Sequence, residues 1–139
     1  MKLRLLLPLL LVATATTPLL RAESDTPLEK QMQLMARTMR QLSGQIADPA
    51  KQQENVTLLG TLRQAAETSR SLDPIKTATV PESQRPAFLA AYRDQMGRLA
   101  SAFSSAGEAV KAGQFDKAKE LVQSVGAIKK EGHSRFKQD

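Results

Sequence analysis

Apolar residues recur at alternating intervals of four and three along much of the chain, and this spacing limits the fold more than any other feature. The first such stripe consists of Leu28, Met32, Met35, Met39, Leu42 and Ile46. Residues with this spacing share one face of an α-helix, whereas a half-buried β-strand requires apolar and polar residues to alternate. No segment shows that alternation. The spacing therefore predicts an all-α protein.

Helix-start and helix-stop residues divide the chain into four helical segments. Thr26, Pro27 and Glu29 match an N-cap, a first helical residue and the closing residue of a capping box. Asp48-Pro49 separates the first two segments, and Gly113 separates the last two. The expected helices cover 27–47, 49–71, 82–112 and 114–136. Since the first and third connections are short, we predict an antiparallel up-down-up-down four-helix bundle.

The first 22 residues are typical of a secretory signal peptide. Lys2 and Arg4 precede an apolar run, and Ala22 offers a cleavage site. The run is short for a membrane span, so a retained anchor is the less favoured alternative. The expected product is one periplasmic domain, residues 23–139, with no stable membrane anchor. Its formal charge is +3 instead of +6, because three basic residues leave with the peptide.

Composition excludes several classes of site. The chain has no cysteine and a single histidine, which excludes disulfides, thiolate metal sites, covalently attached haem and multi-histidine metal centres. Its acidic residues are scattered, and no Ser-His-acid set or glycine-rich phosphate loop is recognisable, so we expect no enzyme. The modest positive charge does not indicate nucleic-acid binding. We expect a monomer.

The predicted topology brings the single histidine, His133, to the same end of the bundle as Met32. Phe88 and Tyr92 of the third helix should lie at a similar height. A neutral imidazole and a thioether on facing helices are a suitable ligand pair for haem iron. Each residue also has an ordinary interpretation, because methionines often fill bundle cores and histidines near helix C-termini are common on surfaces. Spacing alone leaves both interpretations open.

Two end motifs resemble the soluble periplasmic cytochrome b562 family. These are Leu28-Glu29-Lys30-Gln31-Met32 at the start and Gly113 to Glu120 leading to His133-Ser134-Arg135-Phe136-Lys137 at the close. Phe88, Tyr92 and Gly97 also fall where that family has two aromatic residues and a glycine. The resemblance covers essentially all of 23–139, although the middle helices match only in pattern.

This resemblance implies one non-covalently bound haem b per chain, with Met32 and His133 as axial ligands, and an electron-transfer role with redox partner proteins. The residues expected around the haem are Leu28, Met35, Phe88, Tyr92, Lys129 and Phe136. Lys129 and Lys137 flank His133 and could pair with the haem propionates. Gly132 is expected either to admit the edge of the macrocycle or to weaken the last helical turn.

Two other functions fit the same sequence. One is a haem-free periplasmic chaperone or adaptor, because methionine-rich surfaces suit adaptable binding. The other is a cuprous-copper binder, because thioethers are soft ligands. A visible absorption band separates haem from both alternatives, and metal analysis separates copper from the chaperone.

Overall fold

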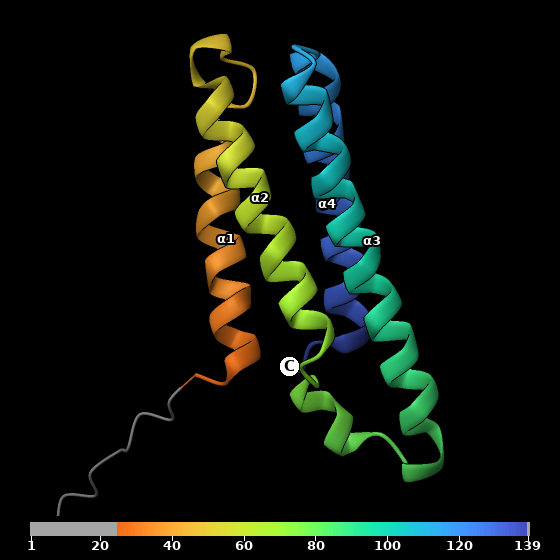
Figure 1. The fold of residues 1–139 in the computed structure, drawn as a ribbon. Coiled ribbons are helices and arrows are strands. Elements are labelled where there is room, and N and C mark those ends of the chain that lie inside the picture. Colours follow the sequence, from red (N-terminus) through yellow and green to blue (C-terminus); the bar gives the residue numbers. More distant parts are fainter. Residues whose placement is uncertain (1–24, 139) are drawn as a thin grey trace, which may run out of the picture.

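The computed structural model describes residues 25–138, so the predicted signal peptide lies outside the described part of the chain. The helices there are α1 (Pro27–Gln45), α2 (Gln52–Arg70), α3 (Arg85–Lys111) and α4 (Phe115–Phe136), and this part contains no strand. They run alternately up and down (Figure 1), which confirms the predicted all-α, antiparallel four-helix bundle. Among residues 25–138, no helix is long and apolar enough to span a membrane.

Local capping sets the helix boundaries much as predicted. The capping box at the start of α1 is complete: the Thr26 amide donates to Glu29 Oε2 at 2.6 Å, and the Glu29 amide donates to Thr26 Oγ1 at 3.2 Å. Asp48 caps a short 3₁₀ turn, η1 (Pro49–Lys51), by accepting from the Ala50 amide at 2.9 Å. Gly113 has a φ of 71° between α3 and α4.

The connection between α2 and α3 is longer and better ordered into turns than the sequence indicated. It contains two 3₁₀ segments, η2 (Ile75–Thr79) and η3 (Glu82–Gln84). Because η3 takes up the residues expected to open the third helix, α3 begins at Arg85, about one turn later than predicted. This connection lies at the same end of the bundle as the start of α1 and the end of α4 (Figure 1).

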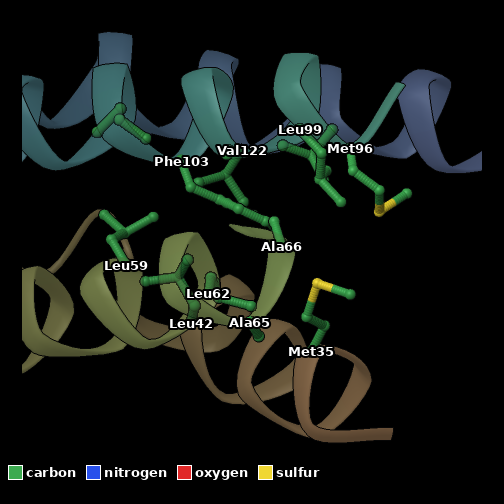
Figure 2. Packing of buried hydrophobic residues seen from close by; sticks show 14 of the residues in the cluster. Met35, Leu42, Leu59, Leu62, Ala65, Ala66, Met96, Leu99, Phe103 and Val122 are labelled. Atoms are coloured by element: carbon green, nitrogen blue, oxygen red, sulfur yellow. The ribbon is translucent and has the colours of Figure 1, made fainter. Parts of the chain in front are cut away.

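The core lies where the two helical hairpins meet. Figure 2 shows Leu42, Leu59 and Leu62 of the first hairpin opposite Phe103 and Val122 of the second. The most extensive packing is between α2 and α3, followed by α3 with α4 and α1 with α2, whereas the backbones of α1 and α4 make almost no close approach. We call the side of the bundle between α1 and α4 the α1–α4 seam. It is the side on which neighbouring helix backbones approach each other least.

Side-chain amides form hydrogen bonds between helices at the other end of the bundle, near the C-termini of α1 and α3. Asn55 is fully buried on α2; its side chain accepts from Gln45 Nε2 at 2.9 Å and donates to the Gln45 carbonyl at 3.0 Å. Gln52 Nε2 donates to the Val110 carbonyl at 2.8 Å. The two carbonyls lie near the C-termini of α1 and α3, where intrahelical donors run out, and each also accepts from a turn amide at 3.0 Å, that of Asp48 or of Gly113.

Two glycines are expected to respond in opposite ways to alanine. Gly60 lies exposed inside α2, and a Cβ added there would meet no atom within 4 Å. Gly60→Ala should therefore stabilise the fold by about 1 kcal/mol, through the higher helix propensity of alanine. Gly113→Ala should destabilise it by about 1–2 kcal/mol, because an L side chain is strained at positive φ. Urea unfolding measures the free energy of unfolding of each variant. A change of the same sign and size in the two variants would contradict the prediction.

Candidate functional site

Met32 projects from the side of α1 that faces away from α2. The α2-facing side is marked by Gln41, whose Nε2 donates to Glu54 at 2.7 Å. Met32 precedes Gln41 by nine residues, which places it about 180° around the helix at about 100° per residue. Its side chain packs against the core but stays partly exposed, whereas Met35 one turn later is buried. Met32 therefore borders the α1–α4 seam.

His133 has the corresponding position on α4. The α3-facing side of α4 is marked by Glu131, whose Oε2 lies 3.2 Å from Arg98 Nη1 of α3. His133 follows two residues later, about 160° around the helix. The residue is accessible to solvent, although part of its side chain is covered. His133 therefore lies on the side of α4 that faces away from α3, along the same seam that Met32 borders.

The topology also gives the two residues similar heights. Met32 lies five residues after the start of α1, and His133 lies three residues before the end of α4. At about 1.5 Å per residue, these positions are about 8 Å and 5 Å from the same end of the bundle (Figure 1). Two shallow surface depressions lie elsewhere, one near Gly113 and one around Gly97, and neither includes Met32 or His133.

Three aromatic side chains pack together at this end. Phe136 of α4 is buried, with its ring centroid 5.3 Å from Phe88 and 5.6 Å from Tyr92, both in edge-to-face geometry. The Tyr92 hydroxyl donates to the Ser69 carbonyl at 2.7 Å. Burial raises the pKa of Tyr92, so this hydroxyl remains protonated. The cluster fixes the end of α4 against α2 and α3, and Phe88 remains partly exposed beside it.

The other residues expected around a cofactor differ in how much of their surface is exposed to solvent. Leu28 packs on the core and is partly exposed, Met35 is buried, and Lys129 is exposed. Within residues 25–138, neither Lys129 nor Lys137 takes part in an ion pair. Lys129 lies four residues before His133 on α4, and Lys137 lies four residues after it, just beyond the end of the helix. Together they make the surface around His133 basic.

The surroundings of His133 favour its neutral form. Its pKa is lowered first by partial burial and then by the charges of Lys129 and Lys137. A neutral imidazole has a free nitrogen lone pair for a metal ion, whereas an imidazolium has none. Among the described residues, no group of three or more His, Asp or Glu side chains could hold a metal ion. The donors at this end are thus one imidazole and the thioethers.

The lowered pKa predicts a pH dependence for the haem-free chain. Since the unfolded state takes up the proton at a higher pH than the folded state, the stability due to this group is lost as the pH falls below about 6.5. Urea unfolding measures the free energy of unfolding at pH 7.5 and at pH 5.5. Between these two pH values, His133→Ala should lose less of this free energy than the original chain. Because both chains carry the same carboxylates, subtracting one loss from the other removes the contribution of those groups. An equal loss in both would contradict the prediction.

Gly132 does not have the role expected of it. A Cβ on Gly132 would lie 3.4 Å from Cγ of Gln95 on α3, so its bare side faces α3 and not the α1–α4 seam. The last turn remains helical as far as the buried Phe136. The expectation that Gly132 admits a macrocycle edge is therefore wrong.

Gln95 was missed from the sequence. It is only 1% exposed, and its Nε2 donates to the Ile128 carbonyl of α4 at 2.7 Å. In the sequence it is one of many polar residues within a helix. The one available signal was its place beside Met96 and Leu99 of the apolar stripe, together with a glycine in the facing helix.

Comparison with known proteins gives one match. A family model described as Cytochrome b562 matches residues 27–137, which includes all four helices. The search of curated proteins and the search of solved structures each found no match.

Proposed function

The chain belongs to the cytochrome b562 family, and from this premise we propose that it binds one haem b at the α1–α4 seam, with Met32 and His133 as axial ligands. Members of this family are electron-carrier cytochromes that bind haem b non-covalently. The proposal adds the ligands, the stoichiometry and the place of binding.

One observation carries the proposal. Met32 and His133 each lie on the side of their helix that faces away from its closely packed neighbour, near the same end of the bundle. A planar group between α1 and α4 would meet a thioether from one side and an imidazole from the other. The donor set fits haem iron, because neutral nitrogen and thioether sulfur are its usual protein ligands.

Each side chain has a distinct part in this proposal. Bound haem supplies the one-electron chemistry of its iron, and thioether ligation favours the ferrous state. Met32 and His133 would hold the haem iron from two helices, an arrangement that would suit electron transfer and not the binding of oxygen or a substrate. Leu28, Met35 and Phe88 would exclude water from the macrocycle. Lys129 and Lys137 would pair with its carboxylates while remaining in contact with solvent.

Location and partners follow from the same proposal. Removal of residues 1–22 on export would leave a periplasmic monomer, in keeping with a family that is periplasmic in general. A redox partner would dock at the end of the bundle that holds the haem edge, because electron transfer requires close approach to that edge. No other cofactor is needed.

The test is a visible spectrum of the purified chain titrated with haemin, before and after dithionite. We expect saturation at one haemin per chain and sharp α and β bands of low-spin iron on reduction. A featureless spectrum, with haemin bound no more tightly than by an unrelated helical protein, would reject haem binding. Metal analysis for copper would then be the next measurement.

A further inference from the structure

Gln95 is a buried polar residue of α3 that makes one hydrogen bond to α4 and accepts another from within its own helix. Its Nε2 donates to the Ile128 carbonyl at 2.7 Å, and its Oε1 accepts from Arg98 Nη1 at 3.1 Å. Burying an amide is costly unless its hydrogen bonds are formed. Since both ends of this amide are bonded, the side chain specifies one arrangement of α3 and α4.

Gly132 makes this arrangement possible. A Cβ on Gly132 would lie 3.4 Å from Gln95 Cγ and 3.5 Å from Gln95 Nε2, so the Gln95 side chain rests directly on the backbone of α4. Arg98 extends the contact outward, with Nη1 3.2 Å from Glu131 Oε2. We call Gln95, Arg98, Glu131 and Gly132 the Gln95 cluster. It contacts one side of the last two turns of α4.

The position of His133 depends on those two turns. Helix ends fray, because the final carbonyls have no intrahelical partner, and His133 lies three residues from the end of α4. A shift of one residue in the contact with α3 would rotate the imidazole by about 100° around the helix. The side of α4 held by the Gln95 cluster is the one opposite His133.

We propose that Gln95 is a positioning residue for His133: its hydrogen bond to Ile128 and its contact with Gly132 fix the rotation of the end of α4 and hold the imidazole at the α1–α4 seam. This inference rests on the proposed function, since it assumes that His133 binds the haem iron. Phe136 anchors the end of α4 through apolar packing, whereas the Gln95 cluster supplies the directional contact.

The test compares Gln95→Leu with Gln52→Leu. Both changes remove a glutamine Nε2 that donates to a carbonyl of another helix, at 2.7 Å and 2.8 Å, but Gln52 lies at the opposite end of the bundle. In the haem-free chain, amide hydrogen exchange of residues 129–136 should become roughly tenfold faster in Gln95→Leu, the order expected for loss of one buried hydrogen bond. Gln52→Leu should leave that segment unchanged.

The loaded chains give the second readout. With haemin bound, Gln95→Leu should show a mixture of low-spin and high-spin ferric iron, and Gln52→Leu only the low-spin form. Faster exchange with an unchanged spectrum would overturn the proposal, because Gln95 would then have only a structural role. Equal exchange of residues 129–136 in the two variants would overturn it as well.

A surface variant protects the test against misfolding of Gln95→Leu. Arg98→Ala removes an exposed residue that bonds Gln95 and Glu131. Arg93→Ala is its control, because Arg93 is also exposed on α3 and its one ion pair within residues 25–138 is with Asp73, at 3.7 Å. Arg98→Ala should make amide exchange of residues 129–136 about twofold faster and should add some high-spin iron to the spectrum. An Arg98→Ala chain that does not differ from Arg93→Ala would overturn the proposal. Failure of the ligand assignment is recognised separately, by a His133→Ala chain that binds haemin as the original does.

Discussion

Replacing His133 with alanine is expected to abolish low-spin haem binding. It is the only histidine in the sequence, so no second imidazole can take its place. Changing an outer partner of a metal ligand typically weakens metal binding by about 10–100-fold, and loss of the ligand itself should exceed that range. Haemin titration followed by the reduced visible spectrum measures the effect.

The neighbouring residue offers a control. Ser134 is exposed, and its hydroxyl donates only to the Glu131 carbonyl, at 2.8 Å. Ser134→Ala should bind haemin as the original chain does. Added imidazole should restore the low-spin bands of His133→Ala, because the free base can fill the vacated position on iron. Unchanged bands in His133→Ala without imidazole would remove His133 as a ligand.

Replacing Met32 with alanine should open one axial position and convert the iron to a high-spin form. The reduction potential should fall, because thioether ligation favours ferrous iron. Haemin affinity should fall by at least roughly tenfold, equivalent to about 1.4 kcal/mol. The spectrum, a redox titration and haemin binding report these three changes independently.

Met35 provides the matched control, because it is the same residue type one turn deeper on α1. It is 6% exposed, so Met35→Ala should destabilise the haem-free fold by about 2–5 kcal/mol through loss of packing. Its loaded form should nevertheless keep the low-spin spectrum. The partly exposed Met32 should show the reverse pattern, with a smaller loss of stability and a lost ligand. High-spin iron in Met35→Ala and not in Met32→Ala would move the ligand by one turn.

Local sequence signals accounted for most of the fold. The capping box from Thr26 to Glu29 and the apolar stripe of α1 depend on residues close together in the chain, so spacing alone reveals them. The start of α3 was placed too early, because Glu82–Gln84 form a 3₁₀ turn that no apolar periodicity distinguishes from an α-helix.

Contacts between helices were harder to predict. Gly132 and Gln95 each had an unremarkable interpretation alone, and only the register of α3 against α4 brings them together. Phe136 centres an aromatic cluster with Phe88 and Tyr92, a contact that spacing did not indicate, and its place beside a cofactor stays a prediction. The stripes identify the apolar side of each helix, but they do not say which neighbouring pair packs closely. The positions of Met32 and His133 on opposite sides of one seam therefore required the structure, and their ligand role stays a prediction.

The scarcity of close backbone contacts between α1 and α4 has a thermodynamic consequence. In the proposed haem-bound form, part of the interior of the bundle would consist of the macrocycle instead of side chains, so loading and folding become linked equilibria. At a free haemin concentration of 100 times the dissociation constant, the folded state would gain about 2.7 kcal/mol. The midpoint of thermal unfolding would then report the fraction of chains that hold haem, and haem-free chains would be the more readily degraded by proteases.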